Sequence, residues 1–387
     1  MPEPLRVLLI SGEYPPMEGG VADFTRILGE ELARQGAEVH VLTARRGAGG
    51  PQGPVQVYPW LDAWSWRPLY GAVRRLLRAL RPQVINIQYQ AAAYGLHPAI
   101  NLLPWMVPMP VVVTFHDLLV PYLFPKAGPL RWGANLALAR RAAAVIVTNA
   151  QDRERLAGYA WLRRLAQIPI GSNIPYALPA DYDRQAWRAR WGIPAEALVL
   201  CYFGFLNASK GGEDLVAALD ELCRAGYNAY LLMIGGAVGA SDPTNHAYLA
   251  RVRAAIAERG LSQRVIWTGH LPPAEVSAGL CSADLCVLPY RDGASFRRGS
   301  FMAALTHGLA IVTTRPQVSL PELVQGENVW LVPPAEPQAL YAALVHLAHD
   351  APLRRRLGEG ARALAQEFTW ERIAARTLEV YRAVAQR

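Results

Sequence analysis

Residues 198–212 read LVLCYFGFLNASKGG, and this stretch decides the fold. Its first six residues are all apolar or aromatic, which is the length and composition of a buried strand. The glycine-rich turn that follows leads into a helical pattern. A strand, a turn and a helix in this order form the repeating unit of a parallel sheet, so we expect an α/β fold.

The same alternation continues in both directions from this stretch. The other strand candidates are short runs separated by helical patterns, at 7–10, 39–43, 55–58, 84–88, 111–115, 145–148, 229–234, 265–268, 285–289, 309–313 and 329–332. A proline-rich segment from Ile168 to Pro179 divides the two series. We therefore expect two doubly wound Rossmann-like domains, residues 1–175 and 176–370, facing across a cleft. Residues 371–387 have one apolar helical face, which fits docking on either domain.

Composition and charge limit the class of protein. The chain has 387 residues, 52% of them apolar and 18% charged, as in a folded globular protein. It has neither a long uninterrupted apolar run nor a basic leader with a cleavage site, so we expect a cytoplasmic protein. The four cysteines form no Cys-x-x-Cys pair, and we expect them to be buried packing residues.

The net charge of +8 is concentrated in the first half of the chain. Residues 1–180 hold 18 Lys+Arg and 11 Asp+Glu, giving +7, whereas residues 181–387 hold 21 and 20, giving +1. No acidic residue lies between Asp62 and Asp117. The first part of this segment holds five arginines close to several aromatic residues: Arg67, Arg74, Arg75, Arg78 and Arg81, with Trp60, Trp64, Trp66 and Tyr70. This pattern suits an anionic membrane surface or acceptor, although a solvated helix face explains it equally well. No nucleic-acid-binding signature is present, so we expect no nucleic-acid partner.

Two motifs of the first half end strands. Gly19 and Gly20 open the first helix, where free backbone amides suit a phosphate, although paired glycines often have only a structural role. His116 and Asp117 follow the fifth strand candidate. His116 is suited to binding a sugar hydroxyl or moving a proton, and the alternative is a histidine held by a structural hydrogen bond.

The second half offers more cationic groups. Lys210, in the turn after Gly204 and Asn207, is one of only two lysines, and its compact ammonium suits a phosphate. The loop 289–300, PYRDGASFRRGS, places Arg297 and Arg298 at a helix start, which predicts an anion site. The alternative is an exposed basic loop. The small residues at two further strand ends leave room for a nucleotide, at Gly235-Gly236 and Thr268-Gly269-His270.

Asp181 and Asp183 have the spacing of a metal-binding Asp-x-Asp motif. They lie at the start of a polar helix, however, and we interpret them as capping residues. No other cluster of metal ligands is apparent, so we expect neither a metal nor another cofactor.

Together these motifs resemble, over nearly the whole chain, the glycosyltransferases of family 4, a retaining family with the GT-B architecture. The residues that carry the resemblance are Gly19-Gly20-Val21, His116-Asp117, 168–173, Gly204 with Lys210-Gly211, Gly235-Gly236, Thr268-Gly269-His270, Ala283-Asp284, Pro321-Glu322-Leu323 and Phe368-Thr369-Trp370. The resemblance implies that the last helix, 371–387, crosses back to the first domain. It also implies a donor diphosphate between the Gly19-Gly20 loop and Lys210.

The sequence departs from the family in its sugar-binding loop. The family usually has two glutamates eight positions apart, and Ser295 and Ala303 occupy those positions. Phe205 stands where an arginine usually follows the glycine of the phosphate loop. Arg297 and Arg298 are candidates to restore the lost phosphate charge, and Asp292 or Ser295 to contact the sugar.

The resemblance implies a metal-independent enzyme that moves a sugar from a nucleotide-sugar donor to a glycan, lipid-linked or small-molecule acceptor. The expected catalytic residues are His116, Lys210 and Arg298. The expected donor-binding residues are Gly19, Gly20, Asn207, Gly235, Gly236, His270, Leu271, Asp292, Ser295, Arg297, Gly299 and Ser300. The missing glutamates leave open a non-catalytic sugar-nucleotide or glycan-binding protein, and an epimerase is a further alternative.

Overall fold

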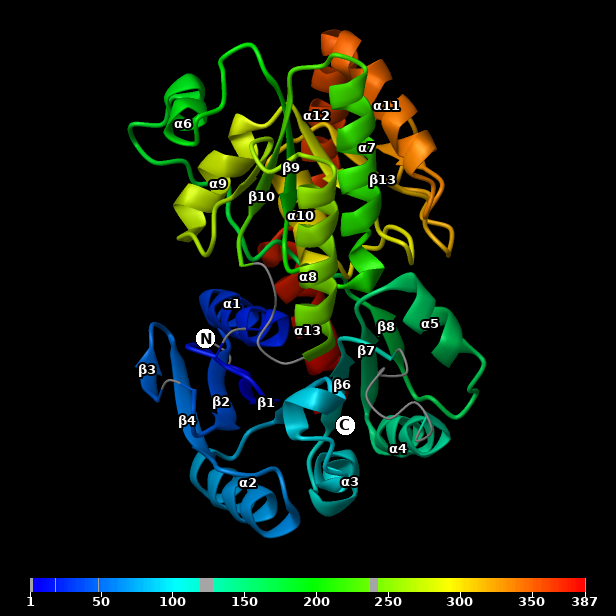
Figure 1. Ribbon diagram of the computed structural model, residues 1–387. Coiled ribbons are helices and arrows are strands. Elements are labelled where there is room, and N and C mark those ends of the chain that lie inside the picture. The colour runs from blue at the N-terminus through cyan, green and yellow to red at the C-terminus, as the bar shows by residue number, and fades with distance from the viewer. Residues whose placement is uncertain (1–2, 18, 48, 119–127, 237–242, 387) are drawn as a thin grey trace. The chain divides into compact units, whose positions relative to one another are not determined.

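The structure is a computed structural model that describes residues 3–17, 19–47, 49–118, 128–236 and 243–386. The chain forms two compact units (Figure 1). Unit 1 comprises Met1–Gly171 together with Thr369–Arg387, and unit 2 comprises Ser172–Phe368. The first division between the units falls inside the proline-rich segment, where residues with restricted backbones favour a connection over a helix or strand.

Unit 1 is built on an eight-stranded sheet with the order β3-β4-β2-β1-β5-β6-β7-β8. The strands are β1 (Arg6–Ser11), β2 (Glu38–Ala44), β3 (Gly50–Gln52), β4 (Val55–Leu61), β5 (Val84–Tyr89), β6 (Val111–Phe115), β7 (Ala144–Val147) and β8 (Leu165–Gln167). All pairs are parallel except β3 with β4. The strand order reverses direction between β1 and β5, and open α/β sheets bind ligands at such a point.

Two helix layers cover the sheet of unit 1. One core lies beneath α2 (Trp66–Leu80), α3 (Ala99–Met106), α4 (Gly128–Arg141) and α5 (Ala150–Ala157). The other lies beneath α1 (Gly20–Arg34) and the C-terminal helix α13 (Trp370–Ala385). Because both faces are covered, the central strands are mostly apolar on both sides, and Asn86 and Gln88 of β5 are buried polar exceptions.

Unit 2 has a six-stranded, fully parallel sheet with the order β11-β10-β9-β12-β13-β14. The strands are β9 (Leu198–Phe203), β10 (Ala229–Ile234), β11 (Val265–Trp267), β12 (Leu285–Leu288), β13 (Ile311–Thr314) and β14 (Trp330–Val332). The helices are α6 (Arg184–Arg190), α7 (Gly212–Arg224), α8 (Pro243–Glu258), α9 (Pro273–Ser282), α10 (Gly299–Thr306), α11 (Pro337–His349) and α12 (Ala351–Ala365). In this sheet the strand order changes direction between β9 and β12, which is the point where an open α/β sheet binds ligands.

The predicted fold class is confirmed, because both units have doubly wound parallel sheets. The sequence reading missed β3 and β8, which form the two edges of the first sheet and have only three residues each. A three-residue edge strand is too short to show the hydrophobic pattern on which strand prediction depends.

The expectation of four buried cysteines is only half right. Cys201 and Cys286 are buried on neighbouring strands, whereas Cys223 and Cys281 lie on helices and are partly exposed. All four are free thiols. Within the described part of the chain, no helix is long and apolar enough to cross a membrane.

Candidate functional site in unit 2

The reversal point of the second sheet brings together two loops that are distant in sequence. One loop follows β9 and contains Lys210, and the other follows β12 and contains Arg297 and Arg298. Backbone contact joins them directly, because the Arg291 amide donates to the Ser209 carbonyl at 2.8 Å. The topology therefore places the lysine loop and the arginine loop at the same sheet edge.

Two glycines make the approach of the loops possible. Gly211 has a left-handed φ of 69°, and a Cβ there would lie 2.0 Å from the Pro289 carbonyl oxygen. Gly204 has a φ of 115°, and a Cβ there would contact Ser300. The Asn207 side chain accepts from the Ser209 amide at 3.1 Å and fixes the short turn that ends at Lys210.

Lys210 and Arg298 share an aromatic neighbour. The Lys210 ammonium lies 4.9 Å from the centre of the Tyr290 ring, and the Arg298 guanidinium lies 5.1 Å from it. The Tyr290 hydroxyl is 2.6 Å from the Ser300 hydroxyl in the second residue of α10. The buried Tyr290 therefore links both cations to the start of α10.

The carboxylate of Asp292 interacts with all three cations of this cluster. Asp292 Oδ2 accepts from Arg298 and from Arg297, the latter at 3.3 Å. Asp292 Oδ1 and Arg298 Nε are buried and have no hydrogen-bond partner among the described residues. Buried polar atoms are almost always paired, so an acceptor and a donor left without partners here mark a place where a polar ligand fits.

The charge of Lys210 is the least compensated of the three. Burial lowers the pKa of Lys210 well below its usual 10.5. The positive charges of Arg298 and Arg297 lower this pKa further, whereas the negative charge of Asp292 raises it. With Asp292 shared between two arginines, the four groups sum to +2. An anion bound beside Lys210 would relieve both the repulsion and the desolvation.

The start of α10 adds backbone donors to this charge. Arg298 is the N-cap residue, and Gly299 and Ser300 form the first positions of the helix. Helix N-termini favour anions because their first amides have no partner within the helix and the helix dipole is positive there. Ser295 is half-buried before this turn, and its hydroxyl accepts from the Arg297 amide at 3.4 Å.

The remaining predicted donor residues occupy neighbouring strand ends. The Gly235 amide donates to the Thr268 hydroxyl at 3.1 Å, and Gly236 lies against the ring of Phe205. His270 is exposed after β11, with Leu271 half-buried beside it. Since β10 separates β11 from β9, His270 and Leu271 follow a strand two positions away from the strand that precedes Lys210.

His116 and the glycine loop of unit 1

His116 ends β6 as expected and belongs to a buried polar network. Its Nε2 lies 2.9 Å from Gln88 Oε1, while the Gln88 amide donates to Asn86 Oδ1. The Tyr381 hydroxyl of α13 donates to the same Asn86 oxygen at 2.7 Å. Because the Gln88 oxygen can only accept, His116 donates from Nε2 and keeps Nδ1 as its acceptor.

Dense packing around the partly exposed ring lowers the pKa of His116 to about 4. Phe24 adds an edge-on ring contact at 4.6 Å. The imidazole is therefore neutral at physiological pH and suited to accept a hydrogen bond from a hydroxyl rather than to carry charge.

The Gly19-Gly20 turn begins α1 as the sequence indicates, with Gly19 as N-cap. A Cβ on Gly19 would lie 2.3 Å from the Glu13 carboxylate, and burial raises the pKa of Glu13. A carboxylate therefore already lies beside this helix start, which distinguishes the loop from the cationic turn around Lys210.

Other polar features and missed residues

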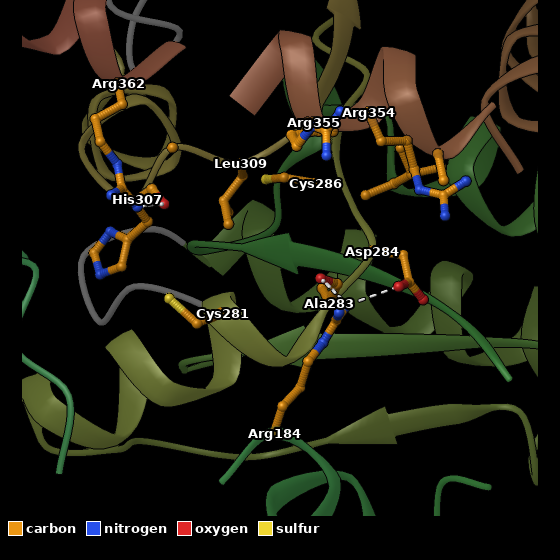
Figure 2. Close-up of a pocket in the computed structure, with 14 residues that line it drawn as sticks. Arg184, Cys281, Ala283, Asp284, Cys286, His307, Leu309, Arg354, Arg355 and Arg362 are labelled. Carbon is orange, nitrogen blue, oxygen red and sulfur yellow. Dashed lines mark hydrogen bonds and ion pairs between the residues drawn. The ribbon is translucent and has the colours of Figure 1, made fainter. Parts of the chain in front are cut away.

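A cavity of 390 Å³ lies at the opposite end of the second sheet, before β12 and β13 (Figure 2). Three arginines at this cavity donate to carbonyls at the ends of helices. Arg184 reaches Ala283 after α9 at 2.9 Å, Arg354 reaches Ala348 in α11 at 2.8 Å, and Arg362 reaches His307 after α10 at 3.4 Å. The cluster compensates three converging helix C-termini.

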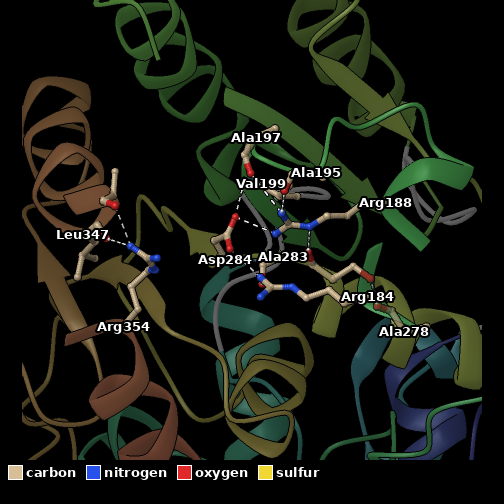
Figure 3. Close-up of polar contacts among 12 residues, drawn as sticks. Arg184, Arg188, Ala195, Ala197, Val199, Ala278, Ala283, Asp284, Leu347 and Arg354 are labelled. Carbon is tan, nitrogen blue, oxygen red and sulfur yellow. Dashed lines mark hydrogen bonds and ion pairs between the residues drawn. The ribbon is translucent and has the colours of Figure 1, made fainter. Parts of the chain in front are cut away.

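Arg188, which lies beside Arg184, also bonds to the end of α9 and to Asp284 (Figure 3). It is 3% exposed, donates to the Ser282 carbonyl at 2.9 Å and pairs with Asp284 at 2.9 Å. Arg184 pairs with the same carboxylate at 2.6 Å. These contacts fasten α6 to the start of β12.

Asp183 is a capping residue as predicted, since it accepts from the Ala186 amide at 2.7 Å at the start of α6. No group of three or more histidine, cysteine or acidic side chains within the described segments is arranged to hold a metal ion.

The sequence reading missed several residues that organise the site. Tyr290 lies just after β12, and its aromatic side chain near the end of a strand is a signal that the sequence offers. Asp214 holds Arg291 with two hydrogen bonds of 2.8 and 2.9 Å. Asn86 and Gln88 carry a signal that was available, since polar amides within an apolar strand must have partners.

Comparison with known proteins identifies the family and the fold. The model described as "Glycosyl transferase 4-like domain" matches residues 19–171, and that described as "Glycosyl transferases group 1" matches residues 197–350. A protein named D-inositol 3-phosphate glycosyltransferase from Corynebacterium efficiens is 26% identical over 97% of this chain and 95% of its own.

Solved structures share the fold. Sucrose-phosphate synthase from Thermosynechococcus elongatus has a TM-score of 0.75 at 23% identity, with 98% of both chains covered. Anabaena HepE in complex with UDP also has a TM-score of 0.75, at 21% identity, and the match covers 98% of this chain and 100% of HepE.

Proposed function

The chain is a family 4-type glycosyltransferase of the GT-B fold, and from that premise we propose that it transfers a sugar from a nucleoside diphosphate sugar with retention of configuration. One observation carries the proposal. At the reversal point of the second sheet, Lys210, Arg297 and Arg298 lie around Asp292, whose carboxylate is shared by the two arginines. A diphosphate supplies the negative charge that this cluster lacks.

The cluster favours the departure of the diphosphate. Negative charge grows on the leaving diphosphate as the bond to the anomeric carbon breaks, so fixed cations stabilise the transition state more than the bound donor. Tyr290 and the start of α10 hold Lys210 and Arg298 in place before the donor arrives. This arrangement supports chemistry without a metal, because the protein's own cations neutralise the leaving group.

We assign retention to attack from the face that the diphosphate leaves. The acceptor oxygen forms a bond to the anomeric carbon as the bond from that carbon to the diphosphate oxygen breaks, and the acceptor proton passes to the diphosphate. In unit 1, neutral His116 keeps Nδ1 as an acceptor that is suited to a sugar hydroxyl.

Known relatives suggest the first substrates to try. HepE structures contain UDP and UDP-glucose, and relatives carry the name D-inositol 3-phosphate glycosyltransferase. We therefore propose a cytoplasmic enzyme, with UDP-sugars as donors and a phosphate-bearing polyol, a glycan or a lipid-linked sugar as acceptor.

The test is nucleotide release from a panel of UDP-, GDP- and ADP-sugars with these acceptors. Lys210→Ala and Arg298→Ala should each lower the rate about 100-fold to 1000-fold, as loss of one electrostatic donor does elsewhere. Arg224→Ala is the matched control, because Arg224 is 70% exposed on α7 and should leave the rate unchanged.

Three outcomes decide between the alternatives. Wild-type rates in both site variants would remove the assignment of the cluster. Binding of a nucleotide sugar without release of nucleotide would favour a non-catalytic binding protein, to which the absence of both glutamates points. Conversion of the sugar on an intact nucleotide would identify an epimerase.

A further inference from the structure

The outer surface of one helix layer in unit 1 has an unusual charge. Three of its helices, α2, α3 and α4, hold seven arginines and no aspartate or glutamate, and the fourth, α5, adds two arginines and two acidic residues. On the opposite face of the same sheet, α1 and α13 together hold five arginines and five acidic residues. The positive excess of the first half therefore belongs to one face of unit 1.

The same layer exposes large apolar side chains. Among the described residues, nine large apolar side chains are exposed, and six of them lie on this layer or beside it: Trp66, Leu96, Leu102, Trp105, Met106 and Leu130. Trp105 is 53% exposed, Met106 63% and Leu130 80%. Leu102, Trp105 and Met106 lie at steps of three and four on α3 and so share one helix face, and an exposed apolar group of this kind marks an interaction site.

The helices of this layer are joined by direct contacts. The Tyr70 hydroxyl of α2 donates to the Ala99 carbonyl of α3 at 3.1 Å, and the Trp105 indole of α3 donates to the Ala137 carbonyl of α4 at 3.4 Å. The apolar residues of α3 are thus flanked by the arginines of α2 and α4. We call this surface the α2–α4 face.

Three arginines of α2 line a shallow groove that is wide open to solvent. It has a volume of 550 Å³ and is lined by Gly71, Arg74, Arg75, Arg78 and Ala79. All three arginines are exposed, so the possibility that this face is buried in the core is excluded. Arg75 lies 4.6 Å above the Trp60 ring, which orders one guanidinium without neutralising it.

We propose that the α2–α4 face docks on an anionic lipid bilayer, with Trp105 and Met106 inserted at the interface and Arg74, Arg75 and Arg78 on lipid phosphates. Charge complementarity selects this partner, because the exposed Arg74, Arg75 and Arg78 lie on a helix that contains no aspartate or glutamate and match a continuous anionic surface. Exposed tryptophan beside arginine is typical of a membrane interface. The proposal goes beyond sugar transfer and stands whether or not the donor assignment holds.

The experiment is sedimentation of the full chain with vesicles of equal parts phosphatidylglycerol and phosphatidylcholine, at low and high salt. Wild type should sediment at low salt, less at high salt, and little with phosphatidylcholine alone. Neutralising Arg74, Arg75 and Arg78 to glutamine should weaken binding on the order of 100-fold. Neutralising Arg224, Arg251 and Arg355 removes the same charge from exposed positions of unit 2 and should change binding little.

A second experiment tests the apolar residues with two double variants, one that removes their hydrophobic side chains and one that keeps them hydrophobic. Trp105→Ser with Met106→Ser should weaken vesicle binding about tenfold or more at both salt concentrations, whereas Trp105→Phe with Met106→Leu should retain it. Melting temperatures close to wild type exclude loss of folding. Nucleotide release measured without vesicles should be the same in all these variants, so a failure of the transferase assignment remains separate.

Several results would overturn the proposal. These are no sedimentation at low salt, equal binding by the Arg74, Arg75 and Arg78 variant, or binding to neutral vesicles unaffected by salt. A dimer of the free protein that Trp105→Ser with Met106→Ser abolishes would show that a second copy covers this face. Binding of inorganic phosphate in the groove without vesicle binding would assign it to a soluble anion.

Discussion

At the scale of single residues, the site depends on a close backbone approach. Gly211 combines a left-handed φ with near-contact to the Pro289 carbonyl, so that Lys210 reaches the ring of Tyr290. A larger residue at 211 must separate the two strand ends. The cluster of charges is therefore set by a position that has no side chain of its own.

Gly211→Ala tests this dependence, with Gly260→Ala as the matched control. Both residues have a φ near +68°, at 69° and 67°, but a Cβ on Gly260 meets nothing within 4 Å. Each variant should lose about 1 kcal/mol from backbone strain. Only Gly211→Ala should lose substantially more stability and lose UDP binding, as measured by thermal unfolding and calorimetric titration. Equal losses in the two variants would show that the contact with Pro289 is unimportant.

His116 should remain neutral down to about pH 4, where its NMR titration is expected. Its pKa is lowered from 6.5, so between pH 6.5 and 4 the unfolded chain binds more protons than the folded one. Stability contributed by this residue is therefore complete above pH 6.5 and falls as pH falls, by up to about 1.4 kcal/mol per pH unit. The imidazole resonance that His116→Gln removes identifies the group, and a midpoint near 6.5 would contradict the burial argument.

At the scale of elements, α13 completes the fold of unit 1. Ile373, Leu378, Tyr381 and Val384 are buried in the core beside β1 and α1, and Tyr381 also reaches the network of His116. The Gln35 side chain of α1 donates to the Glu371 carbonyl at 2.9 Å. A helix that is last in sequence thus contributes to the core of the unit that is first.

Ending the chain after Phe368 should destabilise unit 1 and leave unit 2 folded. Ile373, Leu378, Tyr381 and Val384, four of the buried residues of α13, each contribute about 1.5–3 kcal/mol, a sum comparable to the stability of a whole domain. Limited proteolysis should therefore cleave residues 1–171 first and spare 172–368. Ending the chain after Ala385 is the control and should behave as wild type. Equal protection of both units in the shorter chain would refute the role of α13.

At the scale of the molecule, the two sheets were predictable because parallel strands buried on both sides form apolar runs that need no partner to be recognised. The edge strands β3 and β8 were not predictable, because three residues are too few to show the hydrophobic alternation of a strand. Lys210, Arg297 and Arg298 were found from charge at strand ends. Their sharing of Tyr290 and Asp292 depends on contacts between loops about 80 residues apart, which no local pattern encodes.

The division of charge between the two faces of unit 1 could also be predicted only in part from the sequence. The sequence identified the arginines of α2, but α3 and α4 join them only through tertiary contacts. The apolar residues at the end of α3 read locally as part of a buried helix. Only folding shows that Trp105 and Met106 remain outside.

The place of α13 also sets the order in which the molecule can be made. A ribosome completes all of unit 2 before it releases the helix that unit 1 needs. Through that interval the nascent unit 1 exposes the apolar surface beside β1 and α1 that α13 later covers. The second unit in sequence is therefore the first able to finish folding, and unit 1 matures only when α13 has left the exit tunnel.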